Sequence, residues 1–398
     1  QVLHPRSVEI ARNFGVKLRV RSSLLPFQAE EPHLGTLIVS PPVRVSARSG
    51  GIEMGLAVDT VELDRDQAKL VLVGVPDRPG IAARLFQGIA AAGVNVDLIL
   101  QSLQLSPDHT SLSAQPTNDI AFTISRSQVE QAAGVARRIG QELGCAEVIV
   151  DEAVAKVSIA GVGMIGRPGI AAQMFQVLAE TGINLQMISM SEIKVSCVVA
   201  ADRASDAALA LGEAFQVIPH LHRAGSLPVG DPLPPQASRP VRGIALDLKQ
   251  SRLGIRKVPD RPGTAAHLFG QLAAAGIIVD TIIQSQRGYH NGIPSNDIAF
   301  TVPQDQAVAA EAVCQQVARE LQAAGVDTDH DIAKVSIVGA EMEAHPGVAA
   351  RLFATLAQSG INIEMIATSE IKVSCVVRRA QGILALQAIH RAFELDQP

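Results

Sequence analysis

The chain of 398 residues repeats itself at two levels. The segment GINLQMISMSEIKVSCVV at 182–199 returns with few changes as GINIEMIATSEIKVSCVV at 360–377. A weaker echo lies inside the first half, where VPDRPGIAARLFQGIAAAGVNVD at 75–97 shares its rhythm with GMIGRPGIAAQMFQVLAETGINLQ at 163–186. The second half has the same echo, so a small motif is present four times. Because each copy of such a repeat is one supersecondary unit, the fold must be assembled from four related units.

Each unit is predicted to contain two helices and one small sheet. In the first unit, 68–75 and 118–124 are rich in apolar residues and bounded by turn residues, which is typical of strands. Ile81, Leu85 and Ile89 recur at the spacing of a helix face. The other expected elements are a strand at 94–101, a helix at 128–143 and a strand at 146–150. The order βαββαβ predicts an α+β, ferredoxin-like fold, in which two helices cover one face of a four-stranded antiparallel sheet.

An extra strand-like segment precedes each pair of units, at 55–63 and again at 243–248. The second unit, in turn, shows no convincing closing strand after its second helix. We therefore expect each extra segment to complete the sheet of the second unit of its own pair. The four copies then form two interleaved pairs, whose members do not fold separately.

Composition marks the boundaries between these parts. The segment 225–242 is rich in Pro and Gly, which is typical of a linker. The first forty residues do not follow the repeat and are expected to form a helix at 7–14 and a strand at 17–21, the end of a larger upstream domain. The expected parts are 1–40, the end of that domain; 41–67, a connector with an extra strand; 68–152, the first unit; 153–224, the second; 225–250, the linker with an extra strand; 251–331, the third; and 332–398, the fourth.

Composition also argues against several classes of function. The formal net charge is −5 and Lys and Arg are scattered, which argues against nucleic acid as a partner. No stretch of roughly 18 apolar residues occurs, so no membrane span is expected. None of the four cysteines forms a C-x-x-C pair, so we expect no metal site and a reduced, cytoplasmic protein.

Several motifs together resemble a known family. A strand followed by DRPG and a helix, then GINIEMI, then SEIKVSCVV, resembles the ACT domain, a small amino-acid-sensing module. The match is closest to the ACT pairs at the C-terminus of aspartate kinases. The opening VLHPRSVEIA at 2–11, with GTLI at 35–38, resembles the last segment of an aspartate kinase catalytic domain. Two ACT pairs in tandem resemble the architecture of the cyanobacterial enzymes.

The resemblance implies a feedback-inhibition region that binds lysine and threonine between ACT units. The complete enzyme would use ATP and Mg to phosphorylate L-aspartate to 4-phospho-L-aspartate, at the start of lysine, threonine and methionine biosynthesis. The family's N-terminal K-F-G-G type motif, which helps to bind nucleotide and aspartate, is absent from this sequence. We therefore expect no catalytic residue and no cofactor in this chain, no activity of the chain alone, and a homodimer formed through ACT surfaces.

A free amino acid is a zwitterion, and the segment 77–82 offers partners for both of its charges. Unpaired N–H groups at a helix start favour an anion, the Asp77 carboxylate can accept from an ammonium, and Gly80 permits a close approach to the backbone. The resemblance places one effector on Asp77, Gly80, Ala82 and Gln101, closed by Asn184 and Leu185 of the partner unit. It places the other on Asp260, Gly263, Ala265 and Gln284, closed by Asn362 and Ile363.

The alternative is that Asp77 and Asp260 are plain N-caps. The second and fourth units have Gly166 and Ala344 at the equivalent position, and Met190 and Thr368 near the place of the glutamines. A capping role would be equally useful in all four units. The contrast therefore favours ligand binding in the first and third units.

Two other functions stay open. One is a stand-alone ACT amino-acid-binding or assembly module without kinase activity, against which the VLHPRSV opening argues. The other is a complete enzyme, since split βαβ folds host many chemistries. No nucleophile–base pair, metal cluster or phosphate-cradling loop in the sequence supports an enzyme.

Overall fold

The computed structural model describes 18–20, 36–38, 57–103, 117–164, 167–191, 193–222, 240–284, 288–290, 292–339, 342, 345, 347–369 and 371–395. The helix expected at 7–14 and most of the linker expected at 225–242 lie outside these residues. Near the N-terminus, β1 (Leu18–Val20) pairs antiparallel with β2 (Thr36–Ile38). The strand expected at 17–21 therefore has a partner strand outside the repeat.

The four repeated units are numbered 1 to 4 along the chain. Units 1 and 2 share two long strands, β3 (Thr60–Pro76) and β6 (Glu147–Ala160). Unit 1 adds α2 (Ile81–Ala91), β4 (Ile99–Leu103), β5 (Thr117–Ile124), η1 (Arg126–Gln128) and α3 (Val129–Leu143). Unit 2 adds η2 (Val162–Met164), α4 (Ile170–Glu180), β7 (Met187–Met190), β8 (Lys194–Ala200), α5 (Ala204–Phe215) and β9 (His220–His222).

Units 3 and 4 follow the same plan with shorter strands. Unit 3 contains β11 (Gln250–Pro259), α6 (Thr264–Ala274), β12 (Thr281–Gln284), β13 (Gly288–His290), β14 (Ile293–Pro303), η3 (Gln304–Gln306), α7 (Ala307–Glu320) and β15 (Gly325–Asp329). Unit 4 contains β10 (Gly243–Asp247), β16 (Ile332–Val338), α8 (Val348–Gln358), β17 (Met365–Ser369), β18 (Lys372–Arg378), η5 (Arg379–Gln381) and α9 (Gly382–Ala392).

The strands β3 and β6 join units 1 and 2 into one interleaved pair. The first part of β3 pairs with β6 inside unit 2 (Glu62↔Ser158), and its later part pairs with β6 inside unit 1 (Leu70↔Val150). In the second pair, β10 pairs with β16 in unit 4, and β11 pairs with β15 in unit 3. The α+β, ferredoxin-like fold with four copies in two interleaved pairs is therefore confirmed.

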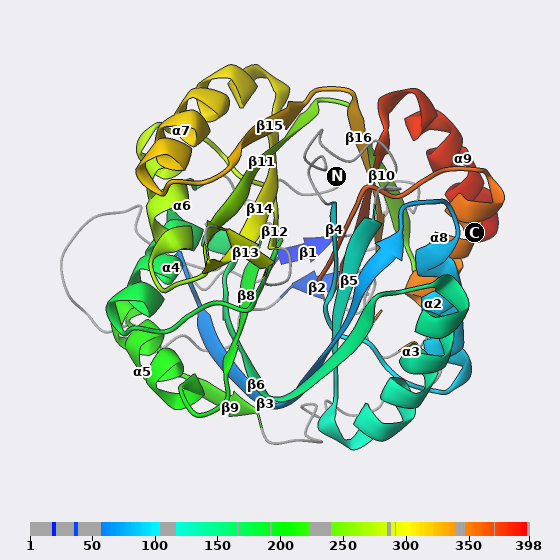
Figure 1. Cartoon of the computed structure of the whole chain (residues 1–398), viewed down its shortest axis with the longest axis horizontal. Helices are drawn as coiled ribbons and strands as arrows, with labels where there is room; N and C mark the ends of the chain where they lie inside the picture. Colours follow the sequence, from blue (N-terminus) through cyan, green and yellow to red (C-terminus); the bar gives the residue numbers. More distant parts are fainter. Residues whose placement is uncertain are drawn as a thin grey trace, which may run out of the picture.

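Neighbouring units come from different pairs. In Figure 1, the helices of units 1 and 4 lie on one side, those of units 2 and 3 on the other, and the strands fill the middle. β4 of unit 1 pairs antiparallel with β17 of unit 4, which extends the sheet across the two units (Gln101↔Ile366). α2 and α8 pack antiparallel, since a Cβ on Gly80 would lie 3.9 Å from Ala357 and one on Gly347 would lie 3.8 Å from Ala90. α4 and α6 of units 2 and 3 pack in the same way, with Gly169 near Ala273 and Gly263 near Ala179.

The hydrophobic cores are also shared between units of different pairs. Phe86 of unit 1 lies 5.4 Å from Phe353 of unit 4 between ring centroids, and Phe175 of unit 2 lies 5.4 Å from Phe269 of unit 3. A third apolar cluster joins residues of all four units where the sheets meet; it includes Val71, Leu100, Met187, Ile283 and Met365. The apolar faces that the helical spacing predicted are buried here, and Ile81, Leu85 and Ile89 all lie inside α2's buried face.

Two strand predictions need correction. The second strand of unit 1 begins at Ile99 rather than at 94, because the chain is still leaving α2 at that point, where Val94 N donates to Ile89 O. Segment 55–63 completes the sheet of unit 2 as expected, because the first part of β3 pairs with β6, but unit 2 also has a short strand after its second helix, β9, which the sequence did not predict and which lies beside β3. β9 is only three residues long and runs parallel to β3 (Leu63↔Leu221), so it is too short to give an alternating pattern.

We expect Phe353→Ala to lower the free energy of unfolding by about 3–5 kcal/mol, because it opens a cavity where α2 and α8 meet. Urea unfolding followed by circular dichroism measures the change. Val308→Ala on α7, where the native side chain is 78% exposed, is the control and should shift the value by less than about 0.5 kcal/mol. A Phe353→Ala variant as stable as the control would contradict the packing of unit 4 on unit 1.

Candidate ligand-binding sites

The starts of α2 and α6 have equivalent local structures. Each helix follows an Asp-Arg-Pro-Gly turn, and Gly80 and Gly263 take φ values of 97° and 96° directly before the first helical residue. That left-handed conformation favours glycine. Among the residues that the structure describes, no side chain caps either helix with a hydrogen bond. The alternative that Asp77 and Asp260 are plain N-caps is therefore wrong, because glycine holds the N-cap position and both carboxylates bond elsewhere.

The Asp77 carboxylate is half-buried and accepts hydrogen bonds from two units. Its Oδ1 accepts from Asn118 Nδ2 of unit 1 at 3.0 Å and from Asn362 Nδ2 of unit 4 at 2.8 Å. The buried Gln101 on β4 donates from Nε2 to the carbonyl of Ile363 at 2.9 Å. Gly80 and Ala82 line the same hollow, which we call the Asp77 site.

The second hollow, the Asp260 site, is built in the same way by units 3 and 2. Asn184 Nδ2 of unit 2 donates to Asp260 Oδ1 at 2.8 Å. The buried Gln284 on β12 donates to the carbonyl of Leu185 at 3.2 Å. Gly263 and Ala265 complete the lining on the side of unit 3.

The twelve expected residues line the two hollows. The two residues that close each hollow, however, are exchanged relative to the expectation. The expectation that Asn184 and Leu185 close the Asp77 site, and that Asn362 and Ile363 close the Asp260 site, is wrong. The cause is the continuous β3 and β6, which set units 1 and 2 end to end. Their side-by-side partners must come from the other pair.

Two buried asparagines in these hollows were missed by the sequence reasoning. Asn118 on β5 and Asn296 on β14 are only 2% and 4% exposed and line the Asp77 and Asp260 sites. Within the described part of the chain, the side-chain oxygen of each has no hydrogen-bond partner. A buried acceptor without a partner is costly and points to a ligand or water. The signal was available, since NDIAFT recurs in units 1 and 3, but it was interpreted only as a strand.

The next residue in each strand is a buried aspartate that shapes the backbone beside the site. Asp119 Oδ1 accepts from the N–H of Gly74 at 2.9 Å, and Asp297 Oδ1 accepts from that of Lys257 at 2.8 Å. Burial raises the pKa of both carboxyls above the ordinary value. These hydrogen bonds sit at the irregular pairing of β3 with β5 and of β11 with β14, just before the Asp-Arg-Pro-Gly turns.

Both hollows are narrow. The cavity volume is about 10 Å³ in the Asp77 site and about 20 Å³ in the Asp260 site. Such a volume holds about one water molecule. An amino acid would therefore enter only if the closing asparagine moved away from the carboxylate.

The equivalent places in units 2 and 4 have a different chemistry. Gly166 and Ala344 lie outside the described residues. Met190 lines a cavity of about 320 Å³ at the start of α4, and Thr368 lines one of about 50 Å³ at the start of α8. Asp280 in the larger cavity is paired with Lys334, and Asp97 in the smaller one is paired with Lys156.

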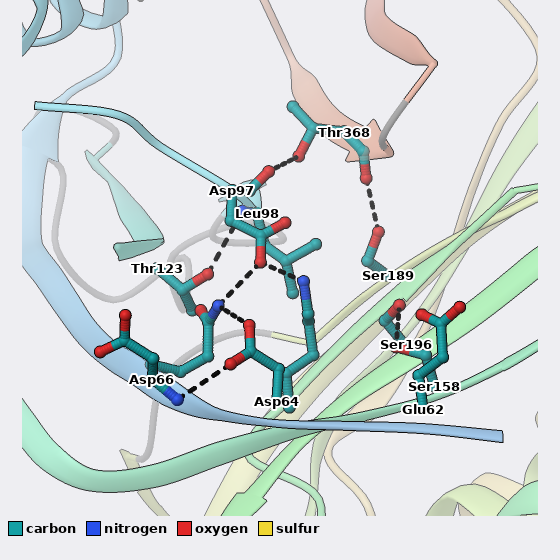
Figure 2. Close-up of polar contacts among 12 residues, drawn as sticks. Glu62, Asp64, Asp66, Asp97, Leu98, Thr123, Ser158, Ser189, Ser196 and Thr368 are labelled. Carbon is teal, nitrogen blue, oxygen red and sulfur yellow. Dashed lines mark hydrogen bonds and ion pairs between the residues drawn. The ribbon is translucent and has the colours of Figure 1, made fainter. Parts of the chain in front are cut away.

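Figure 2 shows how this polar region joins units 1, 2 and 4. Thr368 Oγ1 donates to the carbonyl of Asp97 at 3.3 Å, and Ser189 of unit 2 donates to the carbonyl of Thr368 at 2.6 Å. The Asp97 carboxylate also accepts from Gln67 at 3.0 Å. Thr368 therefore connects three units and is not a counterpart of Gln101.

Comparison with known proteins identifies the repeated unit. A model of the ACT domain matches 157–215 and 335–393, and another ACT model matches 69–105. The chain is therefore a protein built of ACT domains.

The full-length relatives identify the family. The crystal structure of aspartate kinase from Synechocystis is similar to the whole chain, with 49% identity and a TM-score of 0.82, and the chain covers 64% of it. The aspartokinase of Thermus thermophilus is 38% identical over 54% of this chain and 48% of its own length. The aspartate kinase of Pseudomonas fluorescens is 46% identical over 40% of this chain and 37% of its own length. The chain belongs to the aspartate kinase family and corresponds to its ACT regulatory region.

The matched part spans half or less of these two curated relatives. No helix of the described residues is long and apolar enough to cross a membrane. Among those residues, no group of three or more His, Cys, Asp or Glu side chains could hold a metal ion.

A double-mutant cycle tests which residues share a site. We expect Asp77→Ala and Asn362→Ala to be coupled by about 1–2 kcal/mol in the free energy of unfolding, because the two side chains share a charged hydrogen bond. Asp77→Ala and Asn184→Ala should instead add within about 0.5 kcal/mol. Urea unfolding of the two cycles gives both values. Coupling of Asp77 to Asn184 and not to Asn362 would restore the pairing expected from the sequence.

Proposed function

We propose that this chain is the feedback-sensing region of an aspartate kinase and that free lysine and threonine bind at the Asp77 and Asp260 sites. The observation that carries the proposal is a half-buried carboxylate beside a helix start, repeated in both sites between unlike units. A zwitterion needs an acceptor for its ammonium and donors for its carboxylate, and each site offers both.

The ammonium would take the place of the amide N–H groups that now donate to Asp77. Asn118 donates to this carboxylate and has a buried side-chain oxygen that can accept a further hydrogen bond from an ammonium. The ligand carboxylate would lie at the start of α2, where the first N–H groups of a helix have no intrahelical acceptor and favour an anion. Asp260, Asn296 and the start of α6 offer the same set of groups.

Ligand entry would change how the units pack. The ammonium replaces the Asn362–Asp77 hydrogen bond, so the segment of unit 4 that carries Asn362 must shift relative to unit 1. An effector shifts a conformational equilibrium only by its difference in affinity for the two states. A site closed by a second unit provides such a difference, because the closing residues are placed differently with and without the ligand.

In the complete enzyme, this change would favour an inactive arrangement of the catalytic part. That part would bind ATP and Mg and phosphorylate L-aspartate to 4-phospho-L-aspartate in the cytoplasm, the first step toward lysine, threonine and methionine. Two sites provide room for two effectors, and hence for concerted inhibition. Similarity to aspartate kinases supports this proposal.

Calorimetric titration with lysine and with threonine tests the proposal. We expect heat of binding with at least one of them, and Asp77→Ala or Asp260→Ala to weaken binding at its own site about 10- to 100-fold, the value of a hydrogen bond to a charged group. Asp206→Ala on the exposed face of α5 is the matched control and should bind normally. No heat with either amino acid would refute the proposal, and normal binding by the Asp77→Ala, Asp260→Ala variant would refute the site.

We also propose that two copies of the chain associate through ACT surfaces. In the described part of the chain, β10 and β15 each end a sheet, and an open strand edge favours pairing with another strand. We expect light scattering after size-exclusion chromatography at micromolar concentration to give twice the mass of the chain. A monomeric mass under these conditions would contradict the dimer.

A further inference from the structure

A group of four charged residues lies directly behind the Asp77 site, with Glu364 buried and Arg378 exposed. Glu364 follows the closing residues Asn362 and Ile363 in sequence, and it is 5% exposed. Its Oε2 accepts from Arg252 at 3.0 Å, and its Oε1 lies 2.5 Å from Nε of Arg378. Asp329 joins the same group, at 3.2 Å from Arg252 and 2.8 Å from Arg378. Glu364 does not line the hollow but holds the segment that closes it.

The partner of Glu364 belongs to the strand that leads into the other site. Arg252 lies on β11 of unit 3, and this strand runs to Pro259, directly before Asp260. The Glu364–Arg252 ion pair therefore joins the wall of the Asp77 site to the strand that positions the carboxylate of the Asp260 site. Burial raises the pKa of Glu364, the two arginines oppose this, and the nearby charges of Asp329 and Asp77 raise it further.

The first pair contains the equivalent connection in a weaker form. Gln186 follows Asn184 and Leu185, which close the Asp260 site, and its Oε1 accepts from Lys69 at 2.5 Å. Lys69 lies on β3, which runs to Pro76, directly before Asp77. Asp151 lies 3.9 Å from Lys69, whereas Ala200 stands where the second pair has Arg378. Two side-chain contacts therefore join the Asp77 site to the Asp260 site. One is made by the buried carboxylate of Glu364 and the other by the neutral amide of Gln186.

We propose that Glu364 is a positioning residue that couples the two sites. It transmits a shift of the segment closing the Asp77 site to β11, and so to Asp260. The Lys69–Gln186 contact joins the segment closing the Asp260 site to β3, and so to Asp77, and contributes less to the coupling, because an amide attracts a cation less than a carboxylate does. This inference rests on the proposed function, since it requires a ligand at each site.

The test is a calorimetric comparison of threonine binding with and without saturating lysine. In the native chain we expect saturating lysine to change the dissociation constant of threonine about fivefold or more, within the usual range of allosteric coupling. Glu364→Gln, which copies Gln186 of the first pair, should bring this ratio to within about twofold of one. The affinity for the first ligand alone should change less than about threefold, since no group that lines the hollow is lost.

Two further variants separate coupling from folding. Glu364→Gln combined with Arg378→Ala gives the second pair the composition of the first, with Gln186 and Ala200, and also removes the cation that has lost Glu364 as a partner. Gln186→Glu should raise the coupling, because it places a carboxylate beside Lys69. Glu142→Gln removes a surface ion pair with Arg84 and is the control that should leave the coupling unchanged.

Independent binding of the two ligands in the native chain would overturn this inference and leave the proposed function standing. Unchanged coupling in both Glu364 variants would overturn the role of Glu364. A large loss of affinity for a single ligand, with the coupling ratio kept, would show that Glu364 only supports the local structure. Absence of any binding would instead be a failure of the proposed function itself.

Discussion

The pairing of β3 with β6 is the interaction on which the rest of the structure depends. Both strands run through units 1 and 2, so neither unit has a complete sheet without the other. Strands that long leave the two units end to end, each with an open sheet edge and an apolar helix face. The second pair meets the same constraint through β10, β11, β15 and β16. The open sheet edges and the apolar helix faces are covered when unit 1 packs against unit 4 and unit 2 packs against unit 3.

This exchange explains why the candidate sites are composite. The carboxylate and the helix start come from one pair, and the closing asparagine comes from the other. Neither pair alone could form a complete site. The same geometry places two charged or polar connections between the sites, at Glu364 and at Gln186, and their difference in charge gives the two pairs unequal roles. The two pairs, which are otherwise nearly equivalent, therefore differ in this contact.

Much of the local structure followed from the sequence, because local structure depends on local pattern. The apolar spacing of α2 and the βαββαβ order were visible in the first repeat, and the glycine before each helix was visible as part of DRPG. The capping role considered for Asp77 failed because the turn places Gly80, and not the aspartate, at the N-cap. β9 escaped notice because three residues carry no periodicity. Asn118 escaped notice because a strand pattern accounts for it in the sequence, and only the structure shows that its side-chain oxygen is buried with no hydrogen-bond partner in the described part of the chain.

The sequence by itself determined the four units, their internal order, their aspartates and glutamines, and the difference between odd and even units. It could not decide which asparagine closes which site. Asn184 and Asn362 stand in nearly identical segments, so no local property distinguishes their partners. The choice is made by the long-range pairing of β3 with β6 and of β4 with β17, which only the tertiary structure contains. Strand continuity sets two units end to end, and the burial of the remaining helix faces then selects the neighbour from the other pair.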